Sequence, residues 1–559
     1  MKQSNFDSSE DEKEIAKAEL VPGPISSSSS DSEAEAKPAA KVVVPQRKPA
    51  KKVAEGGDSD DDIGAAKWAA GDRKPSVHNF TLLDGETGFV GGRGVPVDTP
   101  PDCFRLFLTP DLSALVVTST NDYGQNSEKA WDRWVDINTN DLDNYIGVCI
   151  YMGICVLPSI ADYWSASFGC KSRLEHVMTM DRFQMIAAHL HVAPQNVDDT
   201  VDKLAKVRDL LNHLNDRCTC LWACGPHLSY DEMMVKNKSK YCRCRTRMPN
   251  KPIKDGLKVF GLCCSATGYV WRHHVYSGEP CDNWQTLGKT GAAISLVCRP
   301  FVNQGRTIYM DNYFTSVKII RHLHSMGYNI VGTAKSNRVD KSIVMKNGKQ
   351  PAGTIKSLTT TDDPPICSYA VQDRGVVYIM SSLHKESQRT TMTRQSGAKE
   401  VEIDAPVALA EYNEGMGGCD TADQKRASYR VQRKRIARWY MSLFYWAIDV
   451  MVINSYVIFS SQAIEIISHK KYRLVLAEVL MQSGRAPVVA ETKMEPCPKR
   501  LKPNEPRPEQ RLQGGLHAPE RLEKGLCCVQ CKGPTRVRYG CDTCKRAMHI
   551  ECFRAWHME

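Results

Sequence analysis

Apolar residues at helical spacing dominate the chain from about residue 76 to residue 225. The segments 141–158, 179–192 and 203–218 each carry apolar residues three and four positions apart, which is typical of amphipathic helices. In the second of these segments, one face would hold Met180, Phe183, Ile186, Ala187 and Leu190. The pattern therefore predicts a helical region over 76–225.

Near residue 226 the pattern changes to short β segments. Residues 257–278, "LKVFGLCCSATGYVWRHHVYSG", predict two strands joined by a turn. Further on, 305–311 predicts a strand that ends on an acid, 315–327 a helix and 328–334 another strand. This order of strand, acid, helix and strand predicts an α+β core over 226–335.

Polar, irregular sequence at 336–410 predicts an insertion, after which 411–430 returns to the core and 431–485 to the helical domain. The most apolar part, 439–459, is long enough to cross a membrane. It contains Asp449 and other polar residues that lipid makes expensive and that a protein core can pair. We therefore expect a buried helix and no membrane partner.

Two segments have the composition of disordered chain. Residues 1–75 are rich in serine and acids and cannot bury enough apolar surface to offset the entropy of ordering. Residues 486–516 are proline-rich and predict a linker. Within the tail, "PQRKPAKK" (45–52) is either a nuclear import signal, which would make the protein nuclear, or a solvated basic run.

Charge is distributed unevenly along the chain. The net charge is +10, but residues 1–62 hold nine Lys and Arg against 14 Asp and Glu, so this segment carries −5 and the remainder +15. A basic body favours a polyanion partner, although the same charge also serves solubility. The 22 cysteines follow no apolar signal segment, so we expect reduced thiols or metal ligands.

Four acids are placed where chemistry is common in α/β sheets. Asp231 lies near the end of a predicted strand, Asp311 ends another, and Asp420 and Asp423 open a helix after a glycine-rich turn. Converging carboxylates repel each other unless cations lie between them, and hard oxygen ligands suit two Mg²⁺ or Mn²⁺ ions. Taken singly, an aspartate at a strand end is more often a turn former or a helix cap than a catalytic group.

Four stretches of the chain resemble the piggyBac family of DNA transposases. They are "SYDEMMVKNKSKYCRCRTRMPNKPIKDGLKVF", "IYMDNYFTSVKIIRHL", "YNEGMGGCDTADQKRASYR" and "ARWYMSLFYWAIDVMVINSYVIF". The similarity spans roughly 100–460. Within it, "MPNKPIKDGLK", "MDNYFTS" and "GGCDTADQ" are long and jointly specific.

The resemblance implies a catalytic D-D-D triad of Asp231, Asp311 and Asp420, with Asp423 as a fourth acid. It also implies a metal-dependent DDE/D-type transposase with an RNase-H-like catalytic core inserted in a helical dimerisation and DNA-binding domain. Such an enzyme cuts and joins double-stranded DNA at transposon terminal inverted repeats, through a hairpin intermediate and at TTAA targets, as a homodimer. The sequence departs from the family at Cys419, and Cys242 and Cys244 are unusual in a DNA-facing region.

Basic residues beside these motifs are candidates for phosphate contacts, which supply affinity without sequence specificity. The alternative is a solvated helix face. The candidates are Arg247, Lys251, Lys254, Lys425, Arg426, Arg430, Arg433, Lys434 and Arg435.

The C-terminal segment 517–559 has the spacing of a zinc module. Paired cysteines two residues apart can share one tetrahedral ion. The candidate ligands are Cys528, Cys531, Cys541, Cys544, His549, Cys552 and His557, with His517 or Cys527 as an eighth. Seven or eight ligands predict two structural Zn²⁺ ions in a cross-brace. The first six positions also fit RING or PHD fingers.

Together these observations predict an α+β multidomain protein with a C-terminal cross-brace zinc finger, acting as a piggyBac-like transposase. One alternative is a domesticated relative that binds DNA or chromatin without transposition. Another is an interaction protein built on the zinc module, such as a histone reader or a ubiquitin ligase.

Overall fold

The protein is described here from a computed structural model. The described residues are 66–82, 87–91, 95–126, 134–165, 174–249, 251–279, 281–396, 399–431, 438–484, 519–528, 530–531, 536–541 and 546–558. The predictions of a disordered tail before residue 66, of a nuclear signal at 45–52 and of a linker at 486–516 lie outside these residues.

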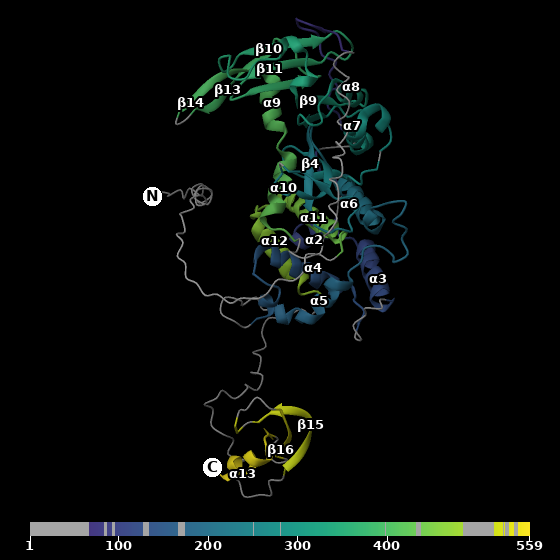
Figure 1. Cartoon of the computed structure of the whole chain (residues 1–559), viewed down its shortest axis with the longest axis vertical. Coiled ribbons are helices and arrows are strands. Elements are labelled where there is room, and N and C mark those ends of the chain that lie inside the picture. The colour runs from purple at the N-terminus through teal and green to yellow at the C-terminus, as the bar shows by residue number, and fades with distance from the viewer. Residues whose placement is uncertain are drawn as a thin grey trace, which may run out of the picture.

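A ten-stranded mixed sheet forms the centre of the described chain (Figure 1). Its order is β1-β10-β11-β12-β9-β8-β4-β6-β5, with β7 paired to β6. The strands are β1 (Trp68–Ala69), β10 (Ile355–Thr360), β11 (Cys367–Gln372), β12 (Val376–Ser381), β9 (Asn329–Ala334), β8 (Thr307–Met310), β4 (His227–Lys236), β6 (Asp255–Cys264), β5 (Thr246–Arg247) and β7 (Val270–Val275). Trp68 pairs with Thr360, so ordered structure begins inside the range predicted as tail.

Six of these strands come from the predicted core: the short β5, and five in the order β7-β6-β4-β8-β9. β6 is antiparallel to β4 and β7, whereas β4, β8 and β9 are parallel. Helix α7 (Trp284–Cys298) connects β7 to β8, and α8 (Val317–Ser325) connects β8 to β9. As predicted, a helix lies within 315–327: Ser316 caps it, and Gly327 follows its end with φ 85°. A Cβ on Gly327 would lie 2.5 Å from Asn303 Cα, so the turn requires glycine.

The segment predicted as an insertion extends the same sheet. β12 pairs antiparallel with β9, and β11 and β10 follow outward. A hairpin of β13 (Arg389–Ser396) and β14 (Lys399–Pro406) extends from this end of the molecule (Figure 1). Helix α9 (Val407–Gly415) then leads back toward the core. Residues 336–410 are therefore continuous with the core through backbone hydrogen bonds.

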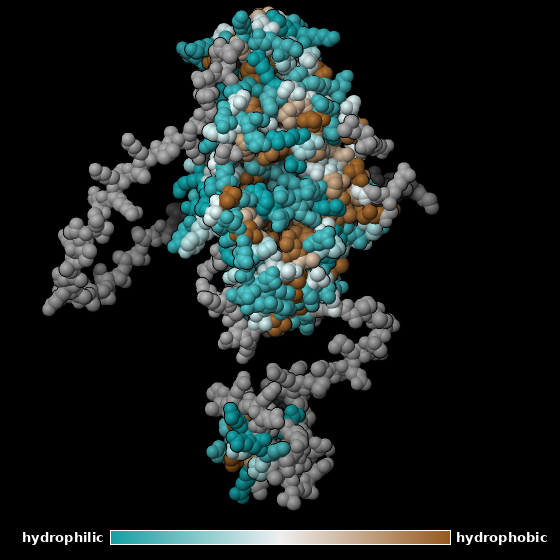
Figure 2. All heavy atoms as spheres, turned by 90° about the vertical axis from the view of Figure 1, so that its right-hand side faces the viewer, coloured by the Kyte–Doolittle hydropathy of each residue, from teal (hydrophilic) through white to brown (hydrophobic). Residues whose placement is uncertain are grey.

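The helical region combines segments from both sides of the core. Its helices are α2 (Pro100–Arg105), α3 (Pro110–Asn126), α4 (Thr139–Ile154), α5 (Met180–His189), α6 (Arg208–Leu221), α11 (Met441–Gln462) and α12 (His469–Leu480), and β2 (Gly88–Phe89) pairs with β3 (Trp222–Ala223). α4 begins with a capping box between Asn138 and Asp141. A mixture of hydrophilic and hydrophobic residues covers the face seen in Figure 2.

Helix α11 is long and apolar enough to cross a membrane. However, 94% of its most apolar 18-residue stretch is buried inside the protein. A helix that is apolar on all sides is expected at the centre of a core. Its one acid, Asp449, contacts Arg473 of α12, with 3.3 Å between carboxylate and guanidinium. Burial raises the pKa of Asp449 to about 6, against the attraction of Arg473.

The C-terminal residues form a small separate core. β15 (Pro519–Cys527), β16 (Arg536–Cys541) and β17 (Arg546–Ala547) pair antiparallel, and α13 (Ile550–Met558) follows them. Val537, Met548 and Trp556 are buried in it.

Arg473→Met tests whether the buried ion pair holds α11 to α12. The side chains of Arg473 and Asp449 are 0% and 1% exposed, so the substitution leaves the buried Asp449 carboxylate without its cationic partner. We expect a loss of about 3–5 kcal/mol in the free energy of unfolding, measured by chemical denaturation. Adding Asp449→Asn removes the stranded charge and should restore much of this loss, and Lys470→Met, at an exposed lysine of the same helix, should have little effect. Equal losses in the single and double variants would contradict this role.

Candidate active site

Parallel pairing of β4 and β8 places Asp231 beside Asp311. Tyr230 is in register with Met310, and the two acids are the next residues along these strands. Because neighbouring strands lie about 4.8 Å apart, the acids start from adjacent backbone positions. Asp231 lies inside β4, which continues to Lys236, and not near the strand end as predicted; it is the parallel pairing with β8 that stops before it.

The backbone holds both carboxylates. One oxygen of Asp311 accepts the N–H of Tyr313 at 2.9 Å, and one oxygen of Asp231 accepts the N–H of Glu232 at 2.7 Å. The turn after β8 is closed by the N–H groups of Phe314 and Thr315, which donate to the Asp311 carbonyl. Each acid is thus oriented by the chain that immediately follows it.

Asp420 is brought to the sheet by helix α10 (Gly418–Ser428), in whose first turn it lies. The Cys419 N–H donates to Ser229 Oγ at 2.9 Å, and Ser229 lies two residues before Asp231 on β4. The Cys419 thiol donates to the Gly261 carbonyl at 3.4 Å. The Cys419 side chain therefore packs against the sheet, where its size affects the seating of α10.

The approach of α10 to the sheet is close enough to require glycine at 418. A Cβ there would lie 2.6 Å from the Cys264 carbonyl oxygen and 2.6 Å from Ser229 Oγ. These distances are far below van der Waals contact. The glycines before Asp420 consequently serve packing as well as the turn.

Electrostatics shows that the acids act on one another. Burial, together with the charges of Glu232 and Asp311, raises the pKa of Asp231 to about 8 against the opposing charge of Lys251. Burial and the charge of Glu232 also raise the pKa of Asp311. Such shifts occur where carboxylates share a site without enough positive charge.

Tyr412 of α9 shows that the third acid belongs to the same neighbourhood. Burial raises the pKa of its hydroxyl to about 12, and the charges of Asp311, Asp231 and Asp420 contribute to the increase. One phenol therefore lies within electrostatic range of all three triad candidates.

The fourth acid, Asp423, makes a structural contact. Its Oδ1 lies 3.0 Å from an Arg426 guanidinium nitrogen, and Arg426 donates to the Met234 carbonyl at 3.1 Å. Arg426 is 3% exposed. The pair fixes α10 against β4 through Arg426, and the expectation that Asp423 assists a metal or holds a nearby backbone group stays a prediction.

The other predicted DNA-binding residues divide by exposure. Arg247 and Lys254 are exposed, whereas Lys425 is half-buried and donates to the Thr267 carbonyl at 2.9 Å. Arg430 is half-buried as well. Arg433, Lys434 and Arg435 lie outside the described residues.

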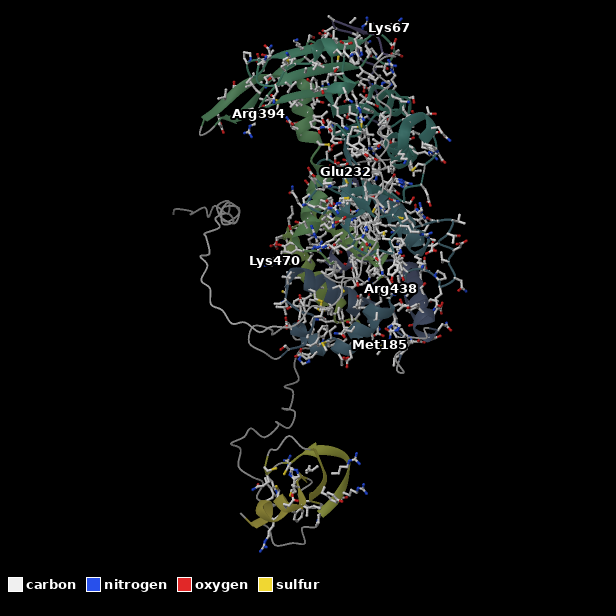
Figure 3. The ribbon with its side chains drawn as sticks, in the orientation of Figure 1. Lys67, Met185, Glu232, Arg394, Arg438 and Lys470 are labelled. Carbon is white, nitrogen blue, oxygen red and sulfur yellow. The ribbon has the colours of Figure 1, made fainter. Side chains whose placement is uncertain are left out.

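Lys251 lies at the acids themselves. Its ammonium is 3.3 Å from Glu232 Oε1. Glu232 is not among the site residues predicted from the sequence, although it directly follows Asp231 in the "DE" pair. Figure 3 shows Glu232 between the hairpin that carries Arg394 and the helical region that carries Arg438.

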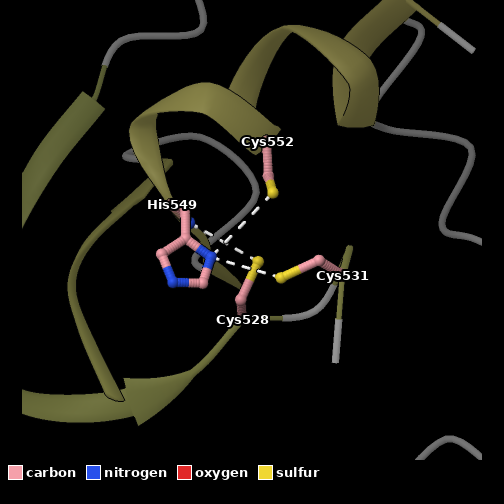
Figure 4. A group of neighbouring side chains, drawn as sticks. All are labelled: Cys528, Cys531, His549 and Cys552. Atoms are coloured by element: carbon pink, nitrogen blue, oxygen red, sulfur yellow. Dashed lines mark hydrogen bonds between the residues drawn. The ribbon is translucent and has the colours of Figure 1, made fainter. Parts of the chain in front are cut away.

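A second possible metal site lies at the C-terminus (Figure 4). The donor atoms of Cys528, Cys531, His549 and Cys552 all lie within 4.8 Å of one another. This Cys₃His set fits one tetrahedral zinc ion. Among the described residues, no other group of three or more His, Cys, Asp and Glu donors is this compact. The donor atoms of the three triad candidates lie further apart.

Not all predicted zinc ligands join this group. Cys541 is buried in the small core, and His557 Nδ1 lies 2.8 Å from the Phe553 carbonyl oxygen. Cys544 and His517, and the side chain of Cys527, lie outside what the structure describes. The described residues thus support one zinc site, and the second site of the cross-brace stays a prediction.

Comparisons with known proteins agree with this architecture. A family model described as Transposase IS4 matches residues 99–456. Human PiggyBac transposable element-derived protein 3 is 25% identical over 476 residues, covering 82% of this chain and 76% of that protein. The human PiggyBac transposable element-derived protein 2 is 23% identical over 508 residues, covering 88% and 81%. The human Chimeric ERCC6-PGBD3 protein is 25% identical, covering 82% of this chain and 43% of that protein.

Among solved structures, the chain is similar to a piggyBac transposase in a cryo-EM structure of its synaptic complex with hairpin DNA. The TM-score is 0.62 at 22% sequence identity, and the match covers 84% of this chain and 100% of that chain. At this identity the likeness establishes the fold, a mixed α+β architecture around a large central sheet.

Gly418→Ala tests the seating of α10. The added methyl group would displace α10 from β4 and β6, so we expect a loss of about 1–3 kcal/mol in the free energy of unfolding, measured by chemical denaturation. Gly417→Ala is the matched control, because a Cβ there meets nothing within 4 Å. Equal effects of the two substitutions would show that close packing at 418 is not what positions the helix.

Proposed function

This chain belongs to the piggyBac-type Transposase IS4 family, and we propose that it is a metal-dependent DNA transposase that cuts and joins DNA through Asp231, Asp311 and Asp420. The observation that carries the proposal is the convergence of these acids, from two parallel strands and one helix, on a neighbourhood shared with Tyr412. The raised pKa values of Asp231 and Asp311 support a site built for cations.

The strand order β7-β6-β4-β8-β9 supports the further proposal of an RNase-H-like core. The first two acids lie where parallel strands β4 and β8 end their pairing, at a sheet edge where α/β proteins gather functional groups. The helical segments on both sides of this core would form the dimerisation and DNA-binding domain.

Asp231, Asp311 and Asp420 would hold two Mg²⁺ or Mn²⁺ ions. When bound, such ions activate a water or hydroxyl and stabilise the leaving oxygen in phosphoryl transfer. The carboxylates fit this group because burial and mutual repulsion leave them short of positive charge. Tyr412 would lie within electrostatic range of all three acids.

The proposed reaction begins with hydrolysis at a transposon end. Water attacks the scissile phosphorus, the P–O3′ bond breaks, and the departing 3′ oxygen takes up a proton. The new 3′-hydroxyl loses its proton and attacks a phosphorus of the opposite strand, the P–O3′ bond to the flanking DNA breaks, and its 3′ oxygen leaves with a proton, which closes a hairpin. Water then opens the hairpin by breaking the new P–O3′ bond and frees the 3′-hydroxyl again. That hydroxyl attacks a phosphorus at a TTAA target, and a target 3′ oxygen leaves. The substrate is double-stranded DNA with terminal inverted repeats, bound by a homodimer in the nucleus.

Arg247 and Lys254 are exposed basic residues close in sequence to Lys251, so they would contact the flanking phosphates. Lys425 and Arg426 already contact the protein backbone, which favours a role in positioning α10. Arg433, Lys434 and Arg435 remain proposed contacts from the sequence.

A domesticated protein that binds DNA or chromatin is the second candidate function. The human relatives, which are described as transposable element-derived, favour it. Intact acids are necessary for transposition and do not establish it.

Strand cleavage separates the two candidates. The purified chain should nick duplex DNA that carries family-type terminal repeats flanked by TTAA in Mg²⁺ or Mn²⁺ and not in EDTA. Asp231→Asn, Asp311→Asn and Asp420→Asn should each lower the rate by roughly a hundredfold or more, because each removes a charge that positions cations at the phosphate. The control Asp282→Asn changes an acid whose side chain is 75% exposed and should cleave normally. Tight DNA binding without nicking in either ion would favour the domesticated protein.

Removal of zinc tests the C-terminal module. Cys531→Ala and Cys552→Ala should each lower the zinc content of the full chain, measured by mass spectrometry of the metal, by about one ion per chain. Cys220→Ala, at an exposed thiol outside the group, is the control and should keep all zinc. Unchanged zinc in both ligand variants would rule out this four-residue site.

A further inference from the structure

A buried carboxylate that the triad does not include lies beside it. Glu232 is on β4 opposite Phe260 of β6, and its side chain is 6% exposed. Oε1 is 3.3 Å from the Lys251 ammonium, whereas Oε2 is buried without a hydrogen-bond partner. Burying half of a carboxylate without a partner is costly, so the open oxygen indicates a missing ligand.

Lys251 is the cation that these acids share. It lies in a turn in which its N–H donates to the Met248 carbonyl at 3.2 Å and the Met248 N–H to the Lys254 carbonyl at 2.7 Å. Its ammonium is in contact with Glu232 and within electrostatic range of Asp231 and Asp311. Three acids therefore act on one ammonium.

The charge balance of this group leaves room for further cations. With one ammonium against three carboxylates, the group carries a deficit of positive charge even before Asp420 is counted. Hard divalent cations bind carboxylate oxygens of this kind. The Lys251 side chain is 36% exposed, so it has a path away from the acids that Glu232 does not have.

We propose that Glu232 is a fourth carboxylate of the metal site and that Lys251 is its resident cation, which an incoming divalent ion displaces. The inference rests on the proposed function for the identity of the ions. It adds Glu232 as a further metal-binding residue and Lys251 as a cation that competes with the metal for the acids. In this arrangement the ion pair keeps the acids together when no metal is bound, and it lowers the affinity for the first ion.

Metal affinity in the absence of DNA tests the competition. We expect Lys251→Met to bind Mn²⁺ roughly three- to tenfold more tightly than the unmodified chain, because a competing charge is removed. Glu232→Gln should bind Mn²⁺ roughly 10- to 100-fold more weakly, because a ligand oxygen and its charge are lost. Affinities would be measured by electron paramagnetic resonance of free Mn²⁺ on the full chain, with the C-terminal site loaded with zinc beforehand.

The double variant Glu232→Gln/Lys251→Met tests whether the two residues act as a unit. If Lys251 competes through its pairing with Glu232, the tightening by Lys251→Met should shrink in the Glu232→Gln background. Lys349→Met and Glu478→Gln change exposed residues of the same types and should leave the affinity unchanged. Thermal unfolding without metal gives a second readout: Lys251→Met should lower the melting temperature, and saturating Mn²⁺ should restore it.

These outcomes separate the inference from the proposed function. Unchanged or weaker Mn²⁺ binding in Lys251→Met, or unchanged binding in Glu232→Gln, overturns the inference even if the chain nicks DNA. The expected opposite shifts in a chain that binds DNA without nicking it support the inference and contradict the proposed transposition. Loss of all Mn²⁺ binding in the unmodified chain overturns the inference as well.

Discussion

The close approach of helix α10 to strands β4 and β6 is the constraint on which the candidate active site depends. Two acids come from neighbouring parallel strands, so ordinary sheet geometry places them together. The third is about a hundred residues further along the chain, and the contacts of Gly418 and Cys419 with Ser229 and Gly261, together with that of Arg426 with the Met234 carbonyl, bring it to the sheet. A side chain at 418 would push the helix, and Asp420 with it, away from the sheet.

Much of this arrangement could be predicted from the sequence, because local patterns determine it. The helix after Asp311, its Ser316 cap and the Gly327 turn follow from capping chemistry and from the glycine requirement at positive φ. The burial of α11 followed from an acid inside an apolar segment. What local patterns do not encode is pairing between distant strands. The sequence predicts an insertion at 336–410, but it does not indicate that β12 hydrogen-bonds to β9, because a period-two pattern does not specify the partner of a strand.

The same limit applies to charged residues. Lys425, Arg426 and Lys251 look alike in sequence, as basic residues beside acidic motifs. The fold directs Arg426 to Asp423 and a backbone carbonyl, Lys425 to another carbonyl, and Lys251 to the acids. Because long side chains reach several angstroms from the backbone, their partners depend on tertiary packing. Asp449 and Arg473 give a second case, since an acid and a base 24 positions apart pair only when α11 packs on α12.

Environment also separates two kinds of candidate metal ligand in this chain. Hard carboxylates gather at the sheet edge, and thiols lie directly behind them, although a thiolate there would favour softer ions. A hydrogen bond with Cys419, followed by burial, raises the pKa of Cys263 far above its usual range, so this thiol keeps its proton. At the C-terminus, burial raises the pKa of Cys528, but the N–H groups of Cys531, His549 and Gln530 outweigh it and bring the pKa to about 6. At Cys528, three N–H groups thus favour a thiolate, and a histidine and two further cysteines surround the sulfur. Cys264 of β6 shows the same effect inside the sheet, because a hydrogen bond with Cys224, with further bonds from Thr267, lowers its pKa to about 5. The hydrogen-bond donors around each sulfur, more than its burial, therefore decide whether a cysteine of this chain is a packing group or a candidate metal ligand.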